Sequence, residues 1–135
     1  MLPTGGSDYI FAIDIAGFRI AHFGDLGQSM ISDGQLTRIG QIDIAFSQLY
    51  NTYSSMDADN AEGIHQMSQV KPPVFIPTHV SGDTARLAST TWKATYTTGP
   101  LTIRGSSLPS ETTVVFMGKD AERYGQEFNL QPASF

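Results

Sequence analysis

The sequence contains no cysteine, and its 135 residues include only eight lysines and arginines and three histidines. The absence of cysteine excludes disulfides, thiolate metal ligands and a cysteine nucleophile. The few basic residues are scattered and are outnumbered by thirteen acidic ones, so the formal net charge is −5. Because an acidic surface repels phosphate groups, we expect neither nucleic acid nor an anionic membrane as a partner.

Long apolar runs are also missing. The longest one is far shorter than the ~20 residues that cross a bilayer. The N-terminal residues Met1 to Gly6 have neither the basic segment nor the apolar core of a signal peptide. We therefore expect a cytoplasmic protein without a membrane partner. Hydrophobic residues make up 40% of the chain, enough to build a core, and we predict a single domain over residues 1–135.

The order of apolar runs and turn residues predicts an α/β fold (α+β by some schemes). Two β-prone runs, residues 9–13 and 18–23, flank Ala16-Gly17 and predict a hairpin. Further strands are expected at residues 42–46, 74–76, 101–104 and 112–117. Asp33 is expected to cap a short helix that holds Leu36 and Ile39, and an Asp59/Glu62 capping box is expected to precede a second helix. A third helix is expected to open at Ser81 or Asp83. Residues 119–135 are expected to form a loose terminal segment. Such alternation indicates one mixed β-sheet covered by helices on one face.

Two residues that can carry chemistry follow strands of this predicted sheet. Asp25 lies between Gly24 and Gly27, and His79 ends the sequence Ile76-Pro77-Thr78-His79. Ligands in α/β sheets commonly bind at the carboxyl ends of strands, and zinc accepts both His nitrogen and Asp oxygen. Taken singly, each pattern has a simpler interpretation. Gly-Asp-x-Gly is typical of a turn whose Asp binds the backbone, and Pro-x-His is typical of a surface histidine.

Four short motifs in this order resemble the metallo-β-lactamase superfamily, with an ascorbate-phosphate lactonase-like branch the nearest. They are His22 to Gly27, Ile39 to Ile44, Asp59-Asn60-Ala61, and Lys71 to His79. The resemblance covers about residues 8–92, and residues 93–135 are expected to add strands and a tail. In that family a strand ends in Gly-Asp, and a helix ending near Pro-Lys precedes a Pro-x-His turn. Here the Pro-Lys order is altered to Lys71-Pro72-Pro73.

The resemblance implies a role for two residues. Asp25 matches the Asp that bridges two metal ions in the family, and His79 matches the last His ligand of the second metal. The family's N-terminal half supplies a His-x-His-x-Asp-His motif, which this sequence lacks. Of the remaining histidines, His22 is expected to be structural and His65 to be a half-exposed helix residue. The chain therefore resembles the C-terminal half of the family fold, which is half of an αββα sandwich.

A solitary half exposes the inner face of its sheet, so we expect a partner on that face. The simplest partner is a second copy of the chain related by a two-fold axis. A catalytic zinc needs about three protein ligands, and this chain offers two, so we expect a non-catalytic dimeric scaffold or binding module. The alternative is a zinc-dependent hydrolase of the lactone or phosphoester class, completed by a second copy or by a separate chain that supplies the missing half. The residues do not identify a substrate.

Overall fold

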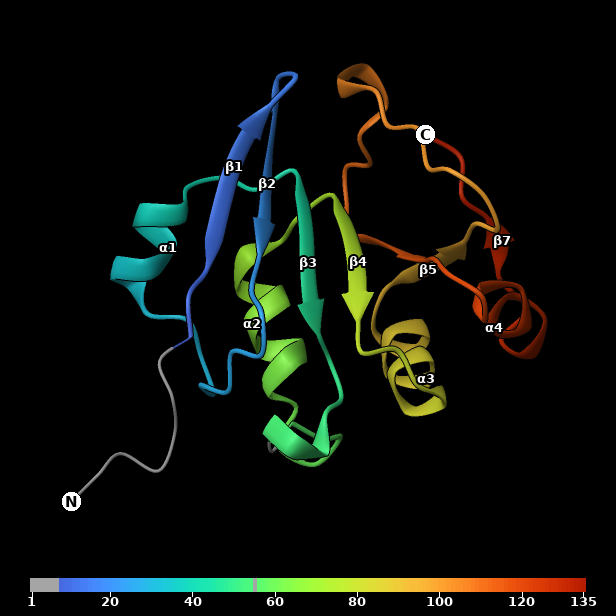
Figure 1. The fold of residues 1–135 in the computed structure, drawn as a ribbon, viewed down its shortest axis with the longest axis horizontal. Coiled ribbons are helices and arrows are strands. Elements are labelled where there is room, and N and C mark those ends of the chain that lie inside the picture. The colour runs from blue at the N-terminus through green and yellow to red at the C-terminus, as the bar shows by residue number, and fades with distance from the viewer. Residues whose placement is uncertain (1–7, 55) are drawn as a thin grey trace.

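The computed structural model describes residues 8–54 and 56–135, in which seven strands form one mixed sheet (Figure 1). The strands are β1 (Phe11–Ile15), β2 (Phe18–His22), β3 (Ile44–Gln48), β4 (Val74–Thr78), β5 (Lys93–Tyr96), β6 (Thr113–Phe116) and β7 (Gln131–Pro132). They lie in the order β1-β2-β3-β4-β6-β5-β7. Within this sheet β1 is antiparallel to β2, and every other recorded pairing is parallel. The predicted fold class is confirmed.

The helices of the described residues lie on one face of the sheet. They are α1 (Asp33–Ile39), α2 (Glu62–Val70), α3 (Gly82–Thr91) and α4 (Ala121–Glu127), with short 3-10 turns η1 (Thr52–Ser54) and η2 (Gly105–Ser107). Each α-helix contributes buried residues to the same core cluster, which also contains Phe75 of β4 and Phe116 of β6. A second, smaller cluster lies on the opposite face of the sheet and includes Ile44, Val74 and Val115. No helix in the described part of the chain is both long and apolar enough to cross a bilayer.

The predicted hairpin is confirmed, and its turn explains why the sequence places Ala16-Gly17 there. Both residues have positive φ angles, 51° for Ala16 and 82° for Gly17. This is the type I′ geometry whose twist matches two antiparallel strands. Ile15 consequently pairs with Phe18, and Ile13 pairs with Ile20. The apolar residues of the two strands therefore share one face of the sheet.

Two predicted helix caps are wrong. The cap of α1 is Ser32, not Asp33: its extended backbone lets the short side chain accept from the N–H of Gln35. The predicted capping box at Asp59 is absent, because α2 begins after Ala61, whose left-handed backbone carries no side-chain cap. Asp59 lies within the preceding turn, where its own N–H donates to the Asp57 carboxylate at 2.9 Å.

The C-terminal third differs most from the prediction. Residues 101–104, expected to form a strand, are not paired in the sheet; Leu101 and Ile103 instead pack over the second cluster. The strand that fills this part of the sheet is β5, which was not predicted. Residues 119–135 are not a loose segment, because they form α4 and β7. β4 also continues through Pro77, which lies opposite Ser47 of β3.

Candidate metal centre

Asp25 lies directly beyond the carboxyl end of β2. The N–H of Phe23 donates to the carbonyl of Phe46 at 2.9 Å, which extends the contact with β3 by one residue. Gly24 then turns the chain with a φ of 58°, and its N–H donates to Nδ1 of His22 at 3.0 Å. The turn fixes the start of the loop that carries the Asp25 carboxylate. The backbone N–H of Gly24 is satisfied by His22, and not by the Asp carboxylate that a Gly-Asp turn was expected to use.

Two glutamines of α2 hold the loop that follows Asp25. Nε2 of Gln66 donates to the carbonyl of Leu26 at 3.1 Å and also to the carbonyl of Gln28. Gln69 binds Ile31 twice, accepting from its N–H and donating to its carbonyl, each at 2.8 Å. Because the backbone of this loop is not itself part of a strand or helix, the glutamine side chains supply the hydrogen bonds that secondary structure would otherwise provide. They were not identified from the sequence, since they lie 38 to 40 residues from the groups they bind.

His79 occupies the equivalent place after β4. Its backbone is left-handed, with a φ of 50°, and it turns the chain away from the strand. Helix α3 begins three residues later behind Ser81, whose side chain accepts from the N–H of Thr84. The hydroxyl of Thr84 in turn donates to the carbonyl of His79 at 3.3 Å. The helix start therefore holds the turn that presents the imidazole.

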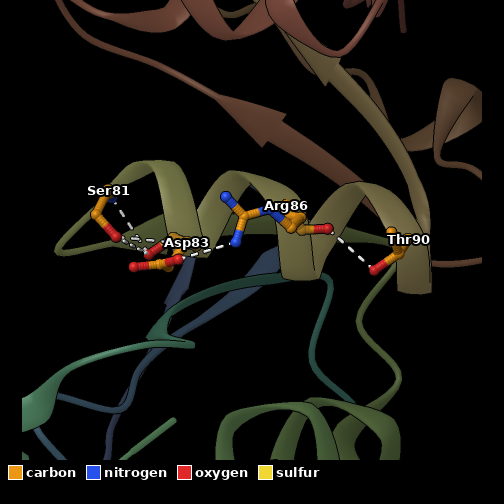
Figure 2. Close-up of polar contacts among 5 residues, drawn as sticks. Ser81, Asp83, Arg86 and Thr90 are labelled. Carbon is orange, nitrogen blue, oxygen red and sulfur yellow. Dashed lines mark hydrogen bonds and ion pairs between the residues drawn. The ribbon is translucent and has the colours of Figure 1, made fainter. Parts of the chain in front are cut away.

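Figure 2 shows how the remainder of α3 is fixed on its exposed side. The Asp83 carboxylate pairs with Arg86 at 3.0 Å, one turn along the helix, and Thr90 donates to the carbonyl of Arg86. Such exposed pairs contribute little to stability. The stability of α3 rests more on its buried side, where Ala85 and Ala88 are fully buried against the core.

The two turns bring Asp25 and His79 together. Nε2 of His79 lies 3.0 Å from Oδ1 of Asp25, and the two side chains are 53% and 54% exposed. The two residues come from strands separated by β3, so their contact depends on the sheet order. The other histidines lie elsewhere: His65 is exposed on α2, and His22 accepts from Gly24 and stacks on Phe46.

Asp25 and His79 are of the types that bind zinc, but two donors are too few to complete a zinc site. An imidazole nitrogen and a carboxylate oxygen are ordinary zinc ligands, and zinc in proteins takes about four. Within residues 8–54 and 56–135, no three His, Asp or Glu side chains are grouped so that they could hold a metal ion. One chain therefore offers two candidate zinc donors, Asp25 and His79, which is fewer than a zinc site requires.

Buried polar atoms without partners lie close to the same sheet edge. Gln48 ends β3 and pairs in register with Thr78 of β4. Gln48 Oε1 accepts from Asn51, whereas Gln48 Nε2 and Thr78 Oγ1 have no hydrogen-bond partner among the described residues. Gln48 is fully buried. A polar residue at the end of a buried strand could have indicated Gln48 from the sequence. The strand predicted at residues 42–46, however, ended two residues before it.

Comparison with known proteins identifies the family. A family model described as a beta-lactamase superfamily domain matches residues 3–79, more than half of the chain and including Asp25 and His79. The chain therefore belongs to this superfamily, and its fold is that of a metallo-β-lactamase. No curated protein gives a significant match.

A solved structure supports the same fold. It is a candidate Zn-dependent hydrolase of the metallo-β-lactamase superfamily from Thermotoga maritima, and it aligns with a TM-score of 0.64 at 21% identity. The alignment covers 80% of this chain and 57% of that one. The chain thus spans little more than half the length of the structure it matches.

Proposed function

We propose that this chain is a half-length metallo-β-lactamase-like module that works as a homodimer, serving as a non-catalytic scaffold or binding module. The observation that carries the proposal is the exposed apolar face of the sheet. Phe11, Ile13 and Ile15 of β1 are 57–62% exposed. Contiguous apolar surface of this kind marks an interaction site in soluble proteins.

The face of the sheet without helices supports this proposal because other parts of the chain cover it only over its central strands and leave the β1 edge open. Leu101, Ile103 and Leu108 pack over the second cluster, together with Ala133 and Phe135. This cover lies over β3, β4 and β6 and does not reach β1, all of whose residues are exposed. A partner that covers the β1 side would remove the apolar side chains from water, and burial of each such side chain contributes about 1.5–3 kcal/mol.

The proposal is tested by native mass spectrometry of the purified chain with and without added zinc. We expect a dimer whose mass is the same with and without zinc. A monomer over the micromolar range would contradict the proposal, since it would mean that the exposed face needs no partner.

A second candidate function is favoured by the contact between His79 and Asp25. It is a zinc-dependent hydrolase of the lactone or phosphoester class, with its site completed by a second copy or by a separate chain. In that case each chain contributes an imidazole and a carboxylate from the same sheet edge. Further donors from the partner would raise the number of ligands to the three or four that a catalytic zinc requires.

Zinc titration calorimetry separates the two candidates. The hydrolase predicts stoichiometric zinc binding that falls at least about tenfold in His79→Ala, because even the loss of an outer-shell partner of a metal ligand costs about 10–100-fold in affinity. His65→Ala is the matched control, because His65 is exposed on α2 away from the pair. If zinc binding is absent, or is equal in the wild type and both variants, the hydrolase is contradicted and the scaffold function stands. Binding lost only in His79→Ala would justify assays on lactones and phosphoesters.

A further inference from the structure

The exposed β1 side chains and a neighbouring hollow lie on the same face of the sheet. We propose that two copies pack face to face about a two-fold axis, with the β1 ridge of each copy seated in the hollow of the other. The ridge is Phe11, Ile13 and Ile15. The hollow is lined by Ile20, Ile44, Phe46, Ile76, Leu101, Ile103 and Met117. This inference rests on the dimeric function proposed above and adds which residues meet.

The ridge is formed by alternation along β1. Successive side chains of a strand point to opposite faces, so residues 11, 13 and 15 share one face. Their pairing with His22, Ile20 and Phe18 places them on the face opposite the helices, because Ile20 and Phe18 belong to the second cluster. As β1 is the edge strand, no further strand shields these side chains.

The hollow lies on the same face, one strand further into the sheet. β2, β3 and β4 provide one side of it, and residues 101–103 with Met117 provide the other. Its volume is about 230 Å³, and its lining residues are all apolar. A cavity of roughly 150 Å³ already accepts a benzene ring, so this hollow has room for an isoleucine or phenylalanine side chain. Met117 is 37% exposed, and methionine adapts readily to an incoming side chain.

A ridge and a hollow on one rigid face cannot meet within a single copy, but they can meet between two. In a two-fold interface each contact occurs twice, so both ridges and both hollows are covered together. The exposed parts of Phe11, Ile13 and Ile15 of both copies then leave water together.

The charge distribution also favours a second copy of the chain. The net charge of −5 opposes self-association through most of the surface. The residues of β1 to β4 that face this side include no Asp, Glu, Lys or Arg: they are Phe11, Ile13, Ile15, Phe18, Ile20, His22, Ile44, Phe46, Gln48, Val74, Ile76 and Thr78. Two copies can approach through this face without bringing carboxylates together.

The cysteine-free sequence allows a direct test by crosslinking. Two single-cysteine variants, Ile13→Cys and Met117→Cys, are mixed in equal amounts and treated with a short bismaleimide. We expect a crosslinked dimer in the mixture and little in either variant alone. Ala12→Cys is the matched control, because Ala12 is exposed on the opposite face of the same strand. It should not crosslink to Met117→Cys.

A charge substitution provides an independent readout. Ile13→Glu should weaken the dimer at least about tenfold in sedimentation equilibrium, since it places a carboxylate in an apolar hollow. Ala12→Glu, with the same charge on the other face, should leave the dimer unchanged. A dimer that lacks the 13–117 crosslink and tolerates Ile13→Glu would overturn the ridge-and-hollow contact and leave the dimeric function standing. A monomeric wild type would instead overturn the dimeric function itself.

Discussion

Individual side chains of α2 determine how the Asp25 loop is held. Gln66 is fully buried and donates to two carbonyls of the loop, and Gln69 makes a two-bond contact with Ile31. The loop between Gly24 and Ser32 has few other long-range backbone partners. The position of the carboxylate thus depends on side chains from a distant helix.

Removing one of these glutamines should destabilise the whole chain. Gln66→Leu keeps the approximate volume but leaves the carbonyls of Leu26 and Gln28 without their donor. We expect the free energy of unfolding to fall by about 1–3 kcal/mol, the cost of unsatisfied buried polar groups. Ser68→Ala, at an exposed position on the same helix, should change it by less than about 0.5 kcal/mol. Urea denaturation of both variants measures the difference, and equal stabilities would contradict the role of Gln66.

The site was predictable at the residue scale to a limited degree. Asp25 and His79 were identified because polar residues that follow parallel strands share one edge of the sheet. Whether either binds metal stays a prediction. The hydrogen bonds of Gln66 and Gln69 to the loop after Asp25 were not predictable, because a glutamine on a helix has no local pattern that indicates a partner 38 residues away.

At the scale of elements, the packing of α2 on β3 depends on one glycine. A Cβ placed on Gly63 would lie 2.8 Å from both the carbonyl oxygen of Gln48 and the Cα of Leu49. These are backbone atoms, which cannot move aside without separating the helix from the strand. The close approach therefore requires glycine at this position.

Gly63→Ala should accordingly be strongly destabilising. We expect a loss of at least about 2 kcal/mol in the free energy of unfolding, as for other overpacked interiors. Gly82→Ala is the control: it lies in the first turn of α3 with open space around its Cβ position, and it should be neutral or slightly stabilising. Thermal melts followed by circular dichroism compare the two. A Gly63→Ala variant as stable as Gly82→Ala would mean that α2 and β3 can separate at little cost.

Elements set by local pattern were predicted, and those set by tertiary packing were not. The hairpin, β3, β4, α2 and α3 follow from apolar periodicity and turn residues. α4 was missed because it contains Gly125, a poor helix residue that is needed there because a Cβ would meet the ring of Tyr96 at 2.6 Å. Residues 101–104 alternate like a strand, but their apolar side chains cover a sheet instead of pairing in one.

For the whole molecule, dimerisation should couple stability to protein concentration. If a second copy covers the open face, unfolding must also separate the copies, and the melting temperature rises with concentration. We expect a measurable rise for the wild type between low and high micromolar concentrations. Ile13→Glu should melt at a temperature that does not depend on concentration. Calorimetric scans at several concentrations test this, and a constant wild-type value would contradict the dimer.

The edge strand β1 also bears on how the chain avoids aggregation. An exposed edge with apolar side chains is a template for further strands, and proteins commonly blunt such edges with a charge. Asp14 lies one residue before the end of β1, with 72% of its side chain exposed, and Arg19 of β2 forms an ion pair with it at 2.8 Å. A sheet in which most strands pair in parallel forms slowly, so the hairpin spends time uncovered during folding. A charge at this position disfavours the addition of another chain's strand to β1, as gatekeeper residues beside exposed apolar strands do.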